Sequence, residues 1–179
     1  MDYELPQEAI KIIKSIEKDV GGRNALETLL VCAGGKPGDK ISFLASPKKI
    51  RKFGNYLSKL KEIVPYLDFV SNGLGEIIYF NKNLATREVA EEVAHIFEKN
   101  LEGSDIVGVF YGYPICCIDA FINDRANGFF PATEHLWCGP DCRKSKTIQQ
   151  NNYRIVRKYA PDLEKYLTPG FNLTRFYKF

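Results

Sequence analysis

Two pairs of cysteines in the C-terminal half are the residues best suited to chemistry in this 179-residue chain. Cys116 and Cys117 are adjacent in the stretch YGYPICCIDAF, and Cys138 and Cys142 follow in HLWCGPDC. Thiolates are ligands of Zn²⁺ and of iron–sulfur clusters, and His135 adds an imidazole just before the second pair. We therefore expect a metal site with Cys116, Cys117, Cys138 and Cys142 as ligands. His135 is either a further ligand or a hydrogen-bonded structural histidine.

The spacing of these cysteines supports a metal only in part. The pattern CC-x₂₀-C-x₃-C differs from the CxxC knuckle of ordinary zinc ribbons. The stretch CGPDCRKS comes near the CxxxCxxC signature of radical-SAM enzymes, but Ser145 stands where the third cysteine would be. The chain is also too short for that barrel. Cys32 has no cysteine or histidine near it in sequence, so we interpret it as a small buried hydrophobe.

Both cysteine pairs are expected near helix starts. Pro114 sits where a helix would begin, and Pro140 or Asp141 can open a second one. Free backbone N–H groups and the positive end of the helix dipole favour a thiolate at such a place. An apolar stripe would then face inward in the first helix, consisting of Ile115, Ile118, Phe121 and Ile122.

The same helical geometry predicts different roles for the two adjacent thiols. Cys116 falls opposite the apolar stripe, and Cys117 lies on its flank. Because neighbouring helical side chains diverge, the two thiols are not expected to chelate one metal together easily. One would serve the site while the other packs, bridges or resolves. Which of the two meets Cys138 and Cys142 stays open.

Thiol redox chemistry is the alternative to metal binding. A Cys116 with a low pKa would attack, and Cys117 or one of the later pair would resolve the mixed disulfide. The candidates for a catalytic role are Cys116 and Asp119, which shares a face with Cys116 at i+3. Motifs such as the P-loop, HExxH and GxSxG are absent from the sequence, so whether the protein is an enzyme is left open.

The C-terminal segment is strongly basic. From Arg143 to Phe179 the local charge is +7, which leaves −4 for the preceding residues out of a total of +3. Such a segment can contact nucleic acid or another anionic partner, although a solvated helix explains it as well. The residues that would track phosphates are Arg143, Lys144, Lys146, Arg154, Arg157 and Lys158.

The elements that position these residues indicate an α+β (mixed α/β) fold, with helices packed on a small mixed sheet and followed by a cysteine-containing helical part. Helical periodicity covers residues 6–22, 24–35, 47–64 and 86–100, and an Asn72-Gly73 turn predicts a hairpin. Residues 105–110, DIVGVF, read as a strand leading into the cysteine motif. We divide the chain into an α/β layer, 1–104, and a cysteine-motif helical region, 105–179, packed together as one unit.

The cysteine segment resembles a known family. The pattern G-[YF]-P-x-C-C-x₃-F, followed by a cysteine pair before a serine, is similar to the archaeal family catalogued as domain of unknown function 483. Here it is carried by Gly112, Tyr113, Pro114, Cys116, Cys117, Phe121, Cys138, Cys142 and Ser145. The resemblance covers about residues 108–146 and implies an archaeal, thermophilic source. It implies no established activity or catalytic residue.

The beginning of the sequence and its hydropathy bear on location. MDYELPQEAI is acidic and lacks the apolar core of a signal peptide. The longest apolar run, IVGVFYGYPICCI, is interrupted by glycine and proline and is too short to span a bilayer. We therefore expect a cytoplasmic protein without a membrane partner, in which thiols are normally reduced.

Overall fold

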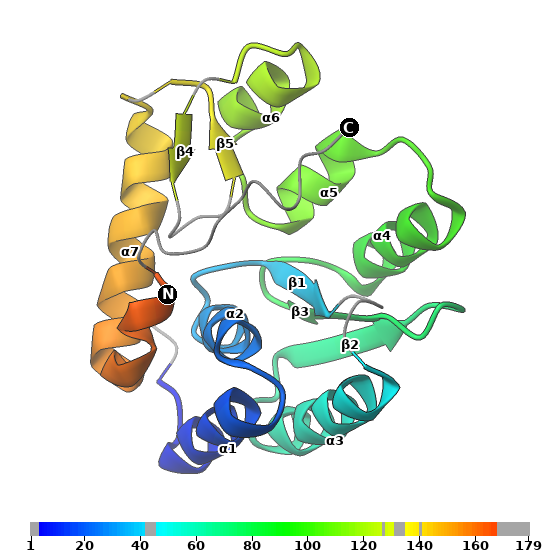
Figure 1. The fold of residues 1–179 in the computed structure, drawn as a ribbon, viewed down its shortest axis with the longest axis vertical. Helices are drawn as coiled ribbons and strands as arrows, with labels where there is room; N and C mark the ends of the chain where they lie inside the picture. The colour runs from blue at the N-terminus through cyan, green and yellow to red at the C-terminus, as the bar shows by residue number, and fades with distance from the viewer. Residues whose placement is uncertain (1–3, 42–45, 127, 131–134, 140, 168–179) are drawn as a thin grey trace.

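Helices cover both faces of a small antiparallel sheet (Figure 1). The structure, a computed structural model, describes residues 4–41, 46–126, 128–130, 135–139 and 141–167. Its elements are α1 (Gln7–Asp19), α2 (Gly22–Cys32), β1 (Gly38–Ile41), α3 (Pro47–Ile63), β2 (Leu67–Ser71), β3 (Ile77–Asn81), α4 (Arg87–Lys99), α5 (Ser104–Phe110), α6 (Ile115–Ile122), β4 (Gly128–Phe130), β5 (His135–Trp137), α7 (Arg143–Tyr159) and the 3₁₀ helix η1 (Pro161–Tyr166).

The central strand β3 divides the interior into two cores. It pairs antiparallel with β1 on one side and with β2 on the other. Because strand side chains alternate between faces, Ile77 and Tyr79 pack with α1, α2 and α3, whereas Ile78 and Phe80 pack with α4 and α5. Every residue of β3 is buried. The predicted α+β fold class is confirmed, but the sheet predicted as mixed is antiparallel, because β3 returns from β2 through a hairpin and pairs antiparallel with β1 as well.

Local sequence signals explain where the main helices begin. The Ser46 side chain accepts a hydrogen bond from the Lys49 backbone N–H at the start of α3, and Thr86 does the same for Val89 at the start of α4. Such caps satisfy backbone donors that have no partner inside the helix. In the predicted hairpin, the Asn72 side-chain oxygen accepts from the backbone of Leu74 and closes the turn.

The strand predicted over residues 105–110 is wrong, because this segment forms helix α5. Its valines and isoleucine favour a strand locally, but packing against α4 and α6 decides the conformation. Gly108 allows α6 to approach closely, since a Cβ there would lie 2.8 Å from Ile118 Cγ1. Phe110 is buried in the second core, whereas Val109 is 54% exposed, as expected for the two sides of a short helix.

The C-terminal helices complete the first core. Helix α7 packs on α2, and η1 contacts both α7 and α2 (Figure 1). The apolar residues that they add to this core are Ile155, Val156, Ala160, Leu163 and Leu167. The end of α7 is therefore anchored in the core, while its start extends towards α6. None of the helices in the described part of the chain is long and apolar enough to cross a membrane.

Candidate metal centre

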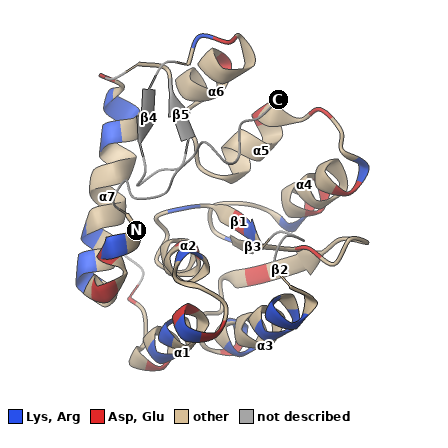
Figure 2. Cartoon of the chain, in the orientation of Figure 1, with Lys and Arg blue, Asp and Glu red and all other residues tan. Residues whose placement is uncertain are grey.

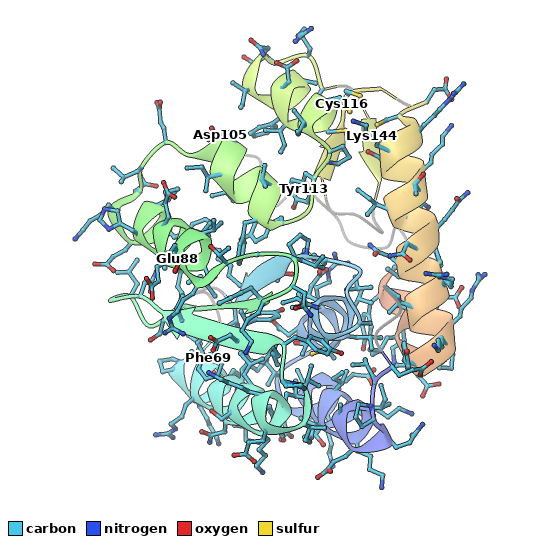
Figure 3. The ribbon with its side chains drawn as sticks, turned by 180° about the vertical axis from the view of Figure 1, so that it is seen from behind. Phe69, Glu88, Asp105, Tyr113, Cys116 and Lys144 are labelled. Atoms are coloured by element: carbon cyan, nitrogen blue, oxygen red, sulfur yellow. The ribbon has the colours of Figure 1, made fainter. Side chains whose placement is uncertain are left out.

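Four cysteine sulfurs converge where α6 and α7 begin. Cys116 and Cys117 lie in the first turn of α6, Cys142 immediately precedes α7, and Cys138 follows β5. Their Sγ atoms all lie within 4.8 Å of one another. Figure 3 labels Cys116 at the start of α6 and Lys144 at the start of α7, and the two helix starts lie side by side. The sequence-based expectation of a four-cysteine group is met.

The separations of the sulfurs suit a single metal ion. The Cys142 Sγ lies 3.6 Å from the Cys117 Sγ and 3.9 Å from the Cys116 Sγ. Four thiolates around one Zn²⁺ at about 2.3 Å form a tetrahedron with edges of about 3.8 Å. All five cysteines of the chain are free thiols. The observed distances are far longer than the S–S bond of about 2.0 Å, so the cluster has the geometry of a chelate.

A tight turn and a short hairpin bring the two cysteine pairs together. Gly112 has a left-handed φ of +79°, and a Cβ at this position would lie 2.6 Å from Pro37 Cδ. This turn reverses the chain between α5 and α6 and places Pro114 just before the first helical turn. Strands β4 and β5 then pair antiparallel and return the chain towards α6, which packs on β5. Cys138 and Cys142 follow directly.

The predicted orientation of α6 is wrong. Of the apolar stripe, only Ile118 is buried, whereas Ile115, Phe121 and Ile122 are exposed by 73%, 45% and 53%. The buried residues of α6 are instead Cys117, Ile118 and Ala120. A helix of eight residues has only a small contact area. In α6, Ile118 contacts α5 and Cys117 contacts the other cysteines of the cluster.

The two adjacent thiols also join one site, contrary to the prediction that only one would do so. Their side chains do diverge by about 100° around the helix axis. At a helix start, however, a ligand from another element can lie between the two directions. Cys142 occupies that place and lies within 4 Å of both sulfurs. Their divergence therefore suits two corners of a tetrahedron.

Ser145 is a site residue to which the sequence analysis gave no role, although it belongs to the family pattern and marks the departure from the CxxxCxxC signature. It is 0% exposed and lies one turn into α7. Its hydroxyl donates a hydrogen bond to the Cys142 Sγ at 3.3 Å and lies 3.3 Å from the Cys117 Sγ. A serine three residues after a helix-capping cysteine shares its face, and this i+3 spacing is the signal that sequence analysis could have used.

Hydrogen bonds concentrate negative charge on one sulfur. Burial opposes ionisation of Cys142, but the hydroxyl and backbone N–H of Ser145 and the neighbouring thiols outweigh it and lower its pKa to about 6. Burial and the hydrogen bonds to neighbouring sulfurs raise the pKa of the Cys138 thiol to about 12. The redox hypothesis named Cys116 as the attacking thiol, and the lowered pKa of Cys142 makes Cys142 a candidate for that role as well.

The remaining candidate residues lie apart from this cluster or outside the described side chains. The His135 side chain belongs to the latter group, since only its backbone in β5 is described. Asp119 is exposed and forms an ion pair with Arg125 at 2.7 Å, and Asp141 forms one with Lys146 at 2.9 Å. Cys32 is fully buried in the first core, as predicted, and burial raises its pKa to about 12.

Comparisons with known proteins do not assign this site. No family model, curated protein or solved structure matches the chain. The geometry of the cysteines and the surfaces around them therefore carry the functional information.

Proposed function

We propose that this chain is a metal-binding protein in which Cys116, Cys117, Cys138 and Cys142 hold one structural zinc ion. The observation that carries this proposal is the mutual proximity of the four sulfurs, all within 4.8 Å. Thiols that merely filled a core would have no reason to approach a tetrahedral arrangement from three separate segments. Structural zinc sites also commonly consist of four cysteine thiolates.

A single ion suits these distances better than an iron–sulfur cluster. A cluster places several irons and sulfides between its cysteine ligands, so their sulfurs stand further apart than around one ion. The Cys117 and Cys142 sulfurs are only 3.6 Å apart. Mononuclear iron shares the four-thiolate geometry with zinc and is distinguished from it by its colour.

A structural role follows from the ligand count and from the core at this end of the molecule. Four protein thiolates fill the tetrahedron and leave no position for a substrate or water. Among the described side chains, the third core cluster consists of Cys117 and Cys142, with Cys116 and Cys138 packed against them. Because cysteines form the core of this region, metal–thiolate bonds would be needed to hold α6, the β4–β5 hairpin and α7 together.

An archaeal source and a cytoplasmic location are part of this proposal. The ligands are among the residues that carry the resemblance to the archaeal family, and membership in that family would make the site a shared feature of it. A cytoplasmic location would keep the four thiols reduced and available to the ion.

Metal analysis of variants tests the zinc site. Untagged protein purified without oxygen should contain one zinc per chain and show no visible absorption. Cys117→Ser should lose the zinc, because one corner of the tetrahedron is removed. Cys32→Ser is the matched control, since it replaces a buried thiol outside the cluster and should keep the zinc. Absence of stoichiometric metal in the unchanged protein would refute the proposal.

Thiol redox chemistry is the second candidate, and the 3.6 Å approach of Cys117 to Cys142 favours it. In this reaction the two thiols lose two protons and two electrons to form a disulfide. A disulfide oxidant such as oxidised glutathione accepts both and becomes two thiols. Counting free thiols by mass spectrometry separates the two functions. A reversible loss of two thiols in metal-free, natively isolated protein supports redox chemistry, and four protected thiols with bound zinc contradict it.

A further inference from the structure

One face of helix α7 is covered with basic side chains. Six of the helix's residues are basic and none is acidic, and each basic residue is exposed. Figure 2 shows them in two groups, one at the start of α7 and one towards its end, with uncharged residues between. We call this the α7 basic face, consisting of Arg143, Lys144, Lys146, Arg154, Arg157 and Lys158.

The basic residues repeat along the helix. Arg143 and Arg154 are eleven residues apart, as are Lys146 and Arg157. Eleven residues make about three helical turns, so each pair lies on the same side of the helix, about 16 Å apart. The 17 residues of α7 give a basic face about 25 Å long. An extended polyanion can contact both groups at once.

Aromatic rings lie among these cations. The Arg157 guanidinium lies 5.3 Å from the centre of the Tyr153 ring, and the Lys158 ammonium lies 4.9 Å from that of Tyr159. Tyr153, Arg154 and Arg157 also line an open hollow of about 470 Å³ together with Gln150. Rings beside cations in a shallow hollow provide stacking surfaces for bases, while the cations hold the backbone.

Two electrostatic features indicate that the face serves an external anion. The first turn of α7 carries basic and no acidic residues, although the helix dipole favours the opposite sign there. Within the described part of the chain, ion pairs join Lys146 to Asp141, Arg157 to Glu164 and Lys158 to Glu4. These ion pairs are exposed, so each contributes little and can be exchanged for a phosphate.

We propose that the α7 basic face binds single-stranded nucleic acid through its phosphates, with bases stacking on the flanking tyrosines. A membrane surface fits less well, because the other exposed residues of α7 itself, Thr147 and Gln150, are polar and offer no apolar side chain for insertion. An acidic polypeptide would match the charge but would not use the stacking surfaces. The inference does not depend on the metal, since all six basic residues lie outside the ligand set.

Helix α3 supplies an internal comparison. It also carries six basic residues, Lys48, Lys49, Arg51, Lys52, Lys59 and Lys61. Lys48 and Lys59 are eleven residues apart and exposed, as Arg143 and Arg154 are. The two helices therefore allow the same charge removal with the same spacing. If attraction by net charge were the whole effect, both removals would weaken binding equally.

The test is the affinity of the full chain for a fluorescein-labelled 20-nucleotide single-stranded RNA, measured by anisotropy between 50 and 200 mM KCl. The double variant Arg143→Gln/Arg154→Gln should bind at least tenfold more weakly than the unchanged protein at 100 mM salt. The slope of log K against log salt should become less steep by about 1.4, because two phosphate contacts are lost. Lys48→Gln/Lys59→Gln should bind within twofold of the unchanged protein.

Three results would overturn the inference. They are no binding at 50 mM salt, equal weakening by the two double variants, and equal affinity for polyglutamate or for phosphatidylserine vesicles. Both double variants replace exposed side chains, and circular dichroism verifies their folding. If the α7 variant unfolds, Lys144→Gln/Lys158→Gln replaces it, with the same expectation. Cys117→Ser protein should lose zinc and still bind RNA. This result would show that RNA binding by the α7 basic face does not require the zinc site.

Discussion

At the scale of single residues, Ser145 shows how the cysteine cluster is controlled from within α7. A fully buried hydroxyl must find a hydrogen-bond partner, and this one finds the Cys142 sulfur. A hydrogen bond to a charged group contributes about 1.5–3 kcal/mol, more than one between neutral groups. Ser145 thus stabilises the thiolate form of Cys142, which is the form that binds a metal.

Replacing Ser145 by alanine is expected to weaken zinc binding while the fold persists. Loss of a hydrogen bond to a ligand typically lowers metal affinity about 10- to 100-fold. Competition with a chromophoric zinc chelator measures this change, and the sulfur-to-cobalt charge-transfer band of the Co²⁺ form should shift. Thr147→Ala is the matched control, because its hydroxyl bonds to the backbone of the same helix at an exposed position. Equal affinity of the two variants would contradict the role of Ser145.

At the scale of elements, the sequence predicted the helices with clear periodicity or a start signal better than the segment that leads into the cysteines. Ser46-Pro47 and Thr86 have specific local chemistry, and α3 and α4 begin where predicted. Residues 105–110 have no such signal, and their conformation depends on packing against the neighbouring helices α4 and α6 and on burial of Phe110 beside Ile78 and Phe80, which are distant in sequence. The four cysteines were predictable as a group, but the direction in which each thiol points was not. The direction of a side chain depends on which neighbouring element covers the helix.

The connection between α5 and α6 is fitted closely against β1, and a methyl group should disturb it. A Cβ at Gly38 would lie 2.2 Å from Phe110 Cζ, and Phe110 is 1% exposed. We expect Gly38→Ala to lower the free energy of unfolding by about 1–3 kcal/mol, as overpacking does in other cores. Urea unfolding followed by circular dichroism gives the value.

Gly54→Ala is the control for this substitution. Its Cβ would meet only the end of the Ile77 side chain, at 3.3 Å, and alanine favours the helix by about 0.5–1 kcal/mol. The two variants are therefore expected to change stability in opposite directions. If Gly38→Ala were neutral, the close packing of Phe110, at the end of α5, on β1 would not contribute to stability.

At the scale of the whole molecule, a buried charge network links α2 to β1 beneath the α5–α6 connection. The Lys36 ammonium lies 2.7 Å from both Glu27 Oε2 and Asp39 Oδ2, and Arg23 also pairs with Glu27. The same ammonium lies 5.3 Å from the centre of the Tyr111 ring. Burial, partly offset by Lys36, together with the charge of Glu27 raises the pKa of Asp39 to about 7. The network therefore makes the free energy of unfolding depend on pH in two ranges, one set by Glu27 and one by Asp39.

The acid side of this dependence is expected from Glu27. Burial opposes its ionisation, but Lys36 and Arg23 outweigh burial and lower its pKa to about 2, from 4.5. The native state therefore binds the proton more weakly than the unfolded state. The stability that Glu27 contributes is complete above pH 4.5 and is lost as the pH falls through about 2. Asp39 acts in the opposite sense, since its raised pKa makes stability fall as the pH rises towards 7.

Glu27→Gln tests the acid side directly. At pH 7 it should cost on the order of 3 kcal/mol, because Lys36 and Arg23 lose a buried partner. Between pH 5 and pH 2.5 it should lose less stability than the unchanged protein, since the group that titrates is gone. Glu102→Gln, an exposed position, is the control and should follow the unchanged protein. Zinc bound at the cysteines as proposed would be lost in acid by all three proteins alike. Parallel urea midpoints for Glu27→Gln and the unchanged protein would therefore exclude Glu27 as the source of the acid sensitivity.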